Sequence, residues 1–91
     1  TGTSGEIADK MGDIMHQMSE DMQVIVITHL PQIASKGDTH YKVYKTDTEV
    51  ATQTQMKQLS EKERVDEIAK MLSGTETTTQ AVENAKVMLG I

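Results

Sequence analysis

Apolar residues recur at helical spacing near the start of the chain. They fall three or four positions apart from Ile7 to Met22, while charged residues occupy mostly the opposite face. Residues 3–6, T-S-G-E, precede this stripe and fit a capping box, in which a hydroxyl and a glutamate satisfy each other's backbone amides. The pattern predicts a helix over about residues 4–21.

Two further helices are predicted in the last third of the chain. Residues 60–63, S-E-K-E, form a second capping box, and Gly74 stands where the helix that follows would end. The apolar stripe of this helix consists of Val65, Ile68, Ala69 and Leu72. A final helix is expected to begin near residues 77–79, to carry apolar residues from Ala81 to Leu89, and to end at Gly90.

The segment between the first helix and the only proline has a different pattern. Residues 23–28, Q-V-I-V-I-T, contain four consecutive β-branched aliphatic residues. Such a run is typical of a strand that is buried on both faces, as in a parallel sheet. His29-Leu30-Pro31 follows directly, and the proline predicts a short helix over residues 31–35 that closes near Gly37.

Alternating polar and apolar residues predict a β-hairpin in the middle of the chain. The first strand lies around Tyr41 and Val43, the second extends from Val50 to Lys57, and residues 46–48 are the expected turn. A helix followed by a buried strand is an α/β pattern. The expected fold is therefore α/β, in the order helix, buried strand, short helix, β-hairpin and two C-terminal helices.

Charge and composition narrow the classes of function. The net charge is −5 and no cluster of Lys and Arg is present, which argues against a DNA-binding surface on this chain. There is no cysteine, so neither a disulfide nor a thiolate metal site is expected. The longest apolar run, Val24 to Ile27, is far too short to cross a membrane. With no signal peptide visible, the expected compartment is the cytoplasm.

The apolar faces of the predicted helices and strand suggest that further protein surface covers them. Seven methionines and only two aromatic residues supply much of the apolar character, and methionine specifies a core weakly. The chain also opens on Thr1 without an initiator methionine. We expect a piece of a longer protein, whose apolar faces are covered by more of the same chain or by a partner copy.

His29 is the most informative candidate for chemistry. It follows the predicted strand at its C-terminal end, where ligands bind in open α/β sheets. One interpretation is a residue that touches a phosphate or a polarised water, and the other is a histidine that only caps the strand. Position alone leaves both open.

The second candidate is the stretch before the first helix, where exposed amides could receive an anion. It consists of Thr1, Gly2, Thr3, Ser4 and Gly5. By composition alone an ordinary helix cap is the better interpretation. The chain has neither the phosphate loop G-x-x-x-x-G-K-[ST] nor G-x-G-x-x-G. His16 and His40 have no partner at metal-ligand spacing, so no metal site is expected.

Four stretches of the sequence together resemble the RecN family. They are T-G-T-S-G-E-I-A-D-K-M-G from residue 1, V-I-V-I-T-H-L-P-Q-I-A from residue 24, G-D-T-H-Y-K-V-Y-K from residue 37 and L-S-E-K-E-R-V-D-E-I-A-K-M-L-S-G from residue 59. RecN proteins are bacterial double-strand-break repair and recombination proteins related to the structural-maintenance-of-chromosomes ATPases. T-H-L-P-Q combined with E-R-V-x-E-I-A-x-M-L-S-G at this separation is a specific signature.

The resemblance implies that residues 1–91 are the C-terminal part of one P-loop, ABC-type ATPase head. His29, within the segment 24–34, matches the switch histidine, which senses the γ-phosphate and helps to orient the attacking water. Residues 1–5 match the D-loop region near the partner's nucleotide, although Thr3 stands where an aliphatic residue is expected. The Walker A loop, signature motif and coiled coil are missing, and the Walker B acids would lie immediately before Thr1.

The resemblance also implies cofactors and partners. ATP and Mg²⁺ would bind in the intact parent, whereas none is expected on this chain alone, which we predict to be inactive. Expected partners are the remainder of the head, a second head in a homodimer around ATP, and DNA through other parts of a nucleoid-associated protein. Two other hypotheses stay open. The chain could be a standalone interaction module that uses the Met-rich helix face, or a small hydrolase that uses His29, for which the sequence identifies no nucleophile.

Overall fold

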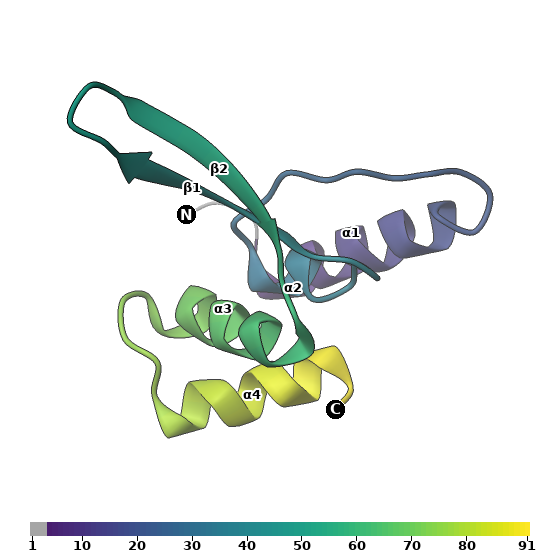
Figure 1. Ribbon diagram of the computed structural model, residues 1–91. Coiled ribbons are helices and arrows are strands. Elements are labelled where there is room, and N and C mark those ends of the chain that lie inside the picture. Colours follow the sequence, from purple (N-terminus) through teal and green to yellow (C-terminus); the bar gives the residue numbers. More distant parts are fainter. Residues whose placement is uncertain (1–3) are drawn as a thin grey trace.

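The structure, a computed structural model, describes residues 4–91 and combines helices with one β-hairpin (Figure 1). In chain order the elements are α1 (Gly5–Met18), α2 (Pro31–Ala34), β1 (Tyr41–Asp47), β2 (Thr52–Gln58), α3 (Glu61–Ser73) and α4 (Thr79–Leu89). The described chain is thus mixed α/β, with four helices and a two-stranded antiparallel sheet. Every helix in residues 4–91 is too short or too polar to cross a membrane.

Helix α1 begins one residue later than a capping box at residues 3–6 would require. Its N-cap is Ser4, and the amide of Ile7 donates to Ser4 Oγ at 3.3 Å. Glu6 lies in the first turn and pairs with Lys10 at 3.6 Å. Thr3 of the predicted capping box lies outside the described residues, but the N-cap is Ser4 rather than Thr3, and the helix ends at Met18 rather than near residue 21.

The C-terminal helices follow their local signals. The amide of Glu63 donates to Ser60 Oγ at 3.2 Å and the amide of Ser60 donates to Glu63 Oε1 at 3.0 Å, which confirms the second capping box. Gly74 and Gly90 take the predicted C-cap positions with positive φ, which glycine adopts at low cost. Helices α3 and α4 pack together around the main core, which consists of Val65, Ile68, Ala69, Ala81 and Ala85.

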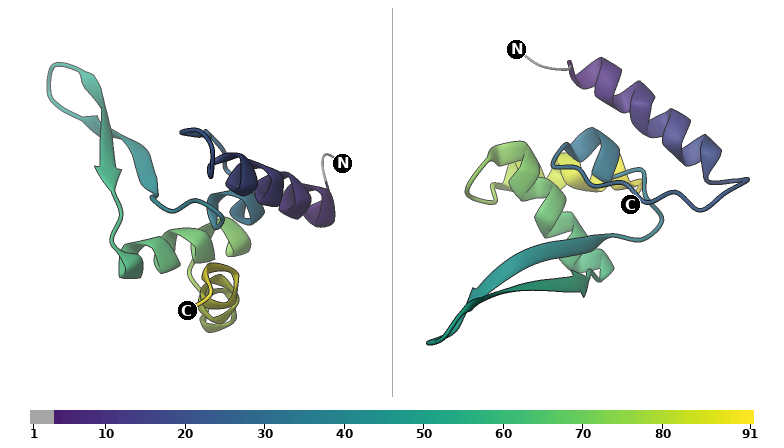
Figure 2. Two further views of the ribbon diagram at one scale, coloured as in Figure 1. Left: turned by 90° about the vertical axis from the view of Figure 1, so that its right-hand side faces the viewer. Right: turned by 90° about the horizontal axis from the view of Figure 1, so that it is seen from above.

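The hairpin projects away from the helices (Figures 1 and 2). Its register runs from the pair Tyr41↔Gln58 to the pair Asp47↔Thr52, so the turn lies at residues 48–51. Thr48 closes this turn, because its amide donates to Ala51 O at 2.8 Å and its Oγ1 accepts from the Ala51 amide at 3.0 Å. The hairpin prediction is confirmed, but the turn lies later than residues 46–48, and Val50 is 93% exposed rather than part of a strand.

The predicted buried strand over residues 23–28 is not found. The segment forms no strand and returns beside α1 as an irregular stretch (Figure 1), and Ile25 and Ile27 are 82% and 99% exposed. A strand requires neighbours for its backbone hydrogen bonds, and in residues 4–91 both strands pair with each other. The expectation was wrong because β-branched residues favour a strand without supplying the strands beside it.

Candidate functional site

His29 lies on a tight turn that leads into α2. Thr28 Oγ1 accepts a hydrogen bond from the amide of Leu30 at 3.0 Å, which spans His29. Pro31 is buried at the first position of α2, where its fixed φ suits a helix start. The His29 side chain itself is exposed. The hydrogen bond from the Leu30 amide and the buried Pro31 therefore fix the backbone around His29, while the imidazole stays accessible to a ligand.

The start of α1 lies next to α2. A Cβ atom built on Gly5 would stand 3.3 Å from Gln32 Nε2, and Gln32 is three residues after His29. Ser4 is exposed, although its hydroxyl already accepts the Ile7 amide. The structure thus brings the end of the candidate stretch 1–5 close to the candidate segment 24–34. Thr1, Gly2 and Thr3 lie outside the described residues.

Helix α2 touches α1 through small residues. Gly12 is buried, and a Cβ added to it would lie 3.0 Å from Gln32 O and 2.8 Å from Lys36 Cγ. Lys36 Nζ binds Asp9 at 3.2 Å and Asp13 at 2.8 Å. The hydrogen bond that Lys36 donates to Asp13 is the largest cause that raises the pKa of Lys36. These contacts fasten the end of α2 along one side of α1.

On its other side α2 is held by Arg64 of α3. Arg64 Nη2 donates to Ala34 O at 3.1 Å, to Ser35 O at 3.3 Å and also to Gly37 O. Burial lowers the pKa of Arg64, and the charge of Asp38 opposes that shift. Sequence reasoning missed this residue, because nothing local in E-R-V indicates a partner about thirty positions earlier.

The other two histidines show no ligand-binding arrangement. His16 is exposed on α1, whereas His40 is half-buried and its Nδ1 is a buried atom without a hydrogen-bond partner. Burial lowers the pKa of His40, the charge of Arg64 adds to that, and the charge of Glu67 opposes it. Within residues 4–91 no group of three His, Asp or Glu side chains is arranged to hold a metal ion.

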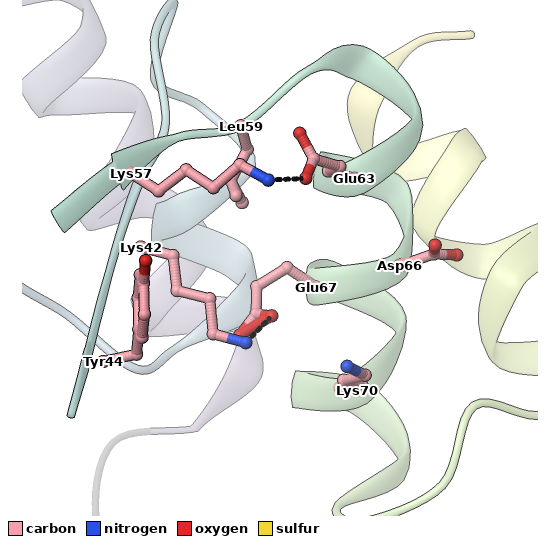
Figure 3. Close-up of a pocket in the computed structure, with 8 residues that line it drawn as sticks. All are labelled: Lys42, Tyr44, Lys57, Leu59, Glu63, Asp66, Glu67 and Lys70. Carbon is pink, nitrogen blue, oxygen red and sulfur yellow. Dashed lines mark hydrogen bonds and ion pairs between the residues drawn. The ribbon is translucent and has the colours of Figure 1, made fainter. Parts of the chain in front are cut away.

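A hollow of about 460 Å³ lies between the hairpin and α3 (Figure 3). Six charged side chains line it, and four of them form two ion pairs: Lys42 Nζ binds Glu67 Oε2 at 3.0 Å, and Lys57 binds Glu63. The hydrogen bond from Lys57 is the largest cause that lowers the pKa of Glu63 to about 2. Because these four side chains neutralise one another across the hollow, they fasten the base of the hairpin to α3 rather than offer a charged ligand site.

A wider open hollow of about 910 Å³ lies between α1, the segment 22–28 and the base of the hairpin. Its apolar lining includes Met15, Met22, Ile25, Val43, Met56 and Met71. Met15 and Met22 of the expected methionine stripe therefore line this hollow, together with Met56 of β2 and Met71 of α3.

Comparison with known proteins relates the whole chain to one group of proteins. No protein-family model matches it. It is 46% identical to DNA repair protein RecN of Rickettsia conorii over 97% of the chain. It is also 41% identical to DNA repair protein RecN of Haemophilus influenzae over 99% of the chain, and 40% identical to that of Bacillus subtilis over 98%.

The chain is homologous to a segment of RecN. This confirms the resemblance carried by the four sequence stretches. The chain spans 16% of the length of these RecN relatives. The matched region includes all the described elements, so His29, Arg64 and the contacts around α2 lie within the homologous segment.

Proposed function

We propose that this chain is a C-terminal segment of an ATP-binding and hydrolysing head in a RecN-like protein for DNA double-strand-break repair and recombination. His29 is its switch histidine, and residues 1–5 are its D-loop. One observation carries the proposal: 97% of the chain aligns with a segment of RecN, and this segment includes an exposed histidine on a turn that leads into α2, the helix whose Gln32 approaches Gly5.

The chemistry assigned to the chain is limited to what its residues can supply. An exposed imidazole can accept a hydrogen bond from a water, or donate one to a phosphate oxygen. Phosphoryl transfer also needs a phosphate loop, Mg²⁺ and a residue that positions the nucleophile. The chain has no phosphate loop, and its described residues offer no carboxylate cluster for Mg²⁺. ATP and Mg²⁺ are therefore assigned mainly to other parts of the head, and to a second head across a homodimer.

DNA is assigned to other parts of the longer protein. The net charge of −5 disfavours contact between this chain and phosphates. The role of the chain is thus to place His29 and the D-loop at a nucleotide, in a protein that resides at the bacterial nucleoid.

The test is His29→Ala in the longer protein that contains this chain. A residue that acts on the γ-phosphate mainly in the transition state lowers kcat more than nucleotide affinity. We expect kcat to fall by roughly 10²-fold, as when one transition-state hydrogen bond is removed, with ATP affinity little changed. His16→Ala is the matched control, because His16 is also an exposed histidine but lies on α1. Normal turnover in His29→Ala would refute the proposal.

A second candidate function is a standalone interaction module that uses the Met-rich face of α1. It is favoured by the exposure of a stripe at helical spacing, the α1 stripe, which consists of Ile7, Met11, Ile14 and Met18. Met11→Lys distinguishes the two candidates. In an ATPase head it weakens packing against the rest of the head and lowers the melting temperature of the longer protein, whereas in a module it abolishes partner binding without a change in stability.

A further inference from the structure

Helix α2 cannot maintain its own conformation. It contains only four residues, and its N-cap, Leu30, provides no side-chain hydrogen bond. Isolated helices of this length are unstable in water, because nucleation is costly and few hydrogen bonds follow it. Neighbouring elements must therefore keep α2 folded, and they must also determine where it lies.

The first neighbour acts on the C-terminal end of α2. The last carbonyls of a helix have no partner within the helix. Arg64 Nη2 donates to Ala34 O at 3.1 Å and to Ser35 O at 3.3 Å, and the same nitrogen donates to Gly37 O beyond the helix. One guanidinium group thus ties α3 to three successive points of the chain that leaves α2.

The second neighbour acts along the side of α2. The backbone of α1 approaches Gln32 O closely enough that a Cβ at Gly12 would lie 3.0 Å from it. Lys36 then reaches back to Asp9 and Asp13. In Figures 1 and 2, α2 lies between α1 and α3. Helix α2 is thus held between α1 and α3, whose contacting residues lie at most about thirty positions from it in the sequence.

The position of α2 determines the position of His29. Only Leu30 separates His29 from the buried Pro31 that starts the helix, and Thr28 Oγ1 accepts the amide of Leu30. The backbone of this turn has little conformational freedom, because the ring of Pro31 fixes the φ angle of that residue. A shift or partial unfolding of α2 therefore moves the imidazole.

We propose that Arg64 and Gly12 are positioning residues, which clamp α2 from two sides and thereby hold His29 in place. The inference rests on the proposed function for its effect on catalysis, but the clamp itself is a structural claim that can be tested separately. Neither residue touches the nucleotide in this scheme; each acts through α2.

The main test is Arg64→Lys in the longer protein. Lysine keeps the positive charge, but it replaces the rigid guanidinium, whose Nη2 reaches all three carbonyls, with a compact, strongly hydrated ammonium group on a flexible stem. We expect kcat for ATP hydrolysis to fall about tenfold while KM stays within about twofold, because a displaced histidine weakens the transition state rather than ATP binding. The control is the reciprocal exchange Lys62→Arg, at an exposed position on the same helix, which should leave both values unchanged.

A double-mutant cycle shows whether Arg64 acts through His29. In a His29→Ala background, Arg64→Lys should cause no further loss of kcat, because the group that it positions is gone. An equal loss in both backgrounds would overturn the proposal, since Arg64 would then act elsewhere. Normal kcat in Arg64→Lys alone would overturn it as well.

Amide hydrogen exchange tests the clamp without reference to catalysis. In the same protein, Arg64→Lys should accelerate exchange in peptides that cover residues 28–38 and leave those from α4 unchanged. Unchanged exchange in 28–38 overturns the clamp, whatever the kinetics. If His29→Ala keeps full turnover, the proposed function fails, and faster exchange in Arg64→Lys still supports the clamp.

Gly12→Ala tests the other side of the clamp. Alanine is the better helix former, so α1 itself is not weakened, but its Cβ would press on the backbone oxygen of Gln32. We expect the same faster exchange in residues 28–38 and the same fall in kcat at constant KM. Wild-type exchange in this variant would overturn the role assigned to Gly12.

Discussion

The exposed apolar surface of this chain predicts that the 91-residue chain self-associates. The α1 stripe faces solvent, and Ile25 and Ile27 in the irregular segment 23–28 are among the most exposed apolar residues. An extended run of β-branched residues without a neighbouring strand is a template for pairing with another chain. Symmetric dimers are the commonest outcome of such pairing.

The free energy of association follows from the exposed fractions of these apolar side chains. Fully burying one isoleucine contributes roughly 1.5–3 kcal/mol. Covering Ile25 and Ile27, 82% and 99% exposed, contributes about 3–5 kcal/mol per copy, and the α1 stripe adds a similar amount. Lost translational and rotational freedom opposes this by about 4–15 kcal/mol. Counted for both copies, the middle of these ranges leaves about 6–7 kcal/mol in favour of association, so we expect a dissociation constant of about 10–100 µM.

The assay is sedimentation equilibrium over concentrations that span this value. The net charge of −5 should oppose association only weakly at physiological salt, where charges are screened beyond about 8 Å. The variant Ile25→Lys, Ile27→Lys places like charges at the pairing edge, so we expect a monomer. Val50→Lys is the matched control, because Val50 is 93% exposed in the hairpin turn and outside this surface.

Two results would refute the reasoning. A wild-type chain that stays monomeric throughout, with slow amide exchange in residues 23–28, would show that the segment completes its own core. Equal weakening of the dimer by Val50→Lys would show that association does not depend specifically on the apolar surface of residues 23–28.

Three further predictions concern activity and stability. The 91-residue chain alone should not hydrolyse ATP, and phosphate release that His29→Ala abolishes would contradict this. Ile68→Ala, at a fully buried position, should lower the free energy of unfolding by about 2–5 kcal/mol in thermal melts, whereas the more exposed Leu72→Ala should cost less; equal losses would contradict the assigned core. The pKa of Glu63 is about 2, below its ordinary 4.5, mainly because of the hydrogen bond with Lys57. Its stabilising contribution is therefore present above pH 4.5 and is lost as the pH falls toward 2. Glu63→Gln should flatten the loss of stability over this pH range, and an unchanged loss would contradict the ion pair.

The elements that were predicted well are those whose signals lie within a few residues. The capping box at residues 60–63 and the glycines at 74 and 90 bound their helices as expected. The hairpin followed from alternation, but its turn moved to residues 48–51 because Thr48 can satisfy the amide and carbonyl of Ala51. A prediction at this level needs only hydrogen bonds and periodicities that the local chain provides.

Only part of the candidate site could be predicted from local sequence patterns. The short helix that starts at Pro31 agrees with expectation, whereas the role of His29 in nucleotide hydrolysis stays a prediction. The contact between Gly5 and Gln32, and the grip of Arg64 on the end of α2, join residues far apart in the chain. No local pattern encodes such pairs, because they exist only once the helices have packed.

The sequence by itself determined the bounds of the two C-terminal helices, the presence of the hairpin, and the relationship to RecN. Tertiary structure alone decided that residues 23–28 lie exposed without a sheet, and that α1 and α3 hold α2 between them. The physical reason is one of distance along the chain. Caps and turns are satisfied by atoms a few residues away, whereas a strand needs neighbouring strands, and a one-turn helix needs neighbouring helices, which come from distant parts of a chain.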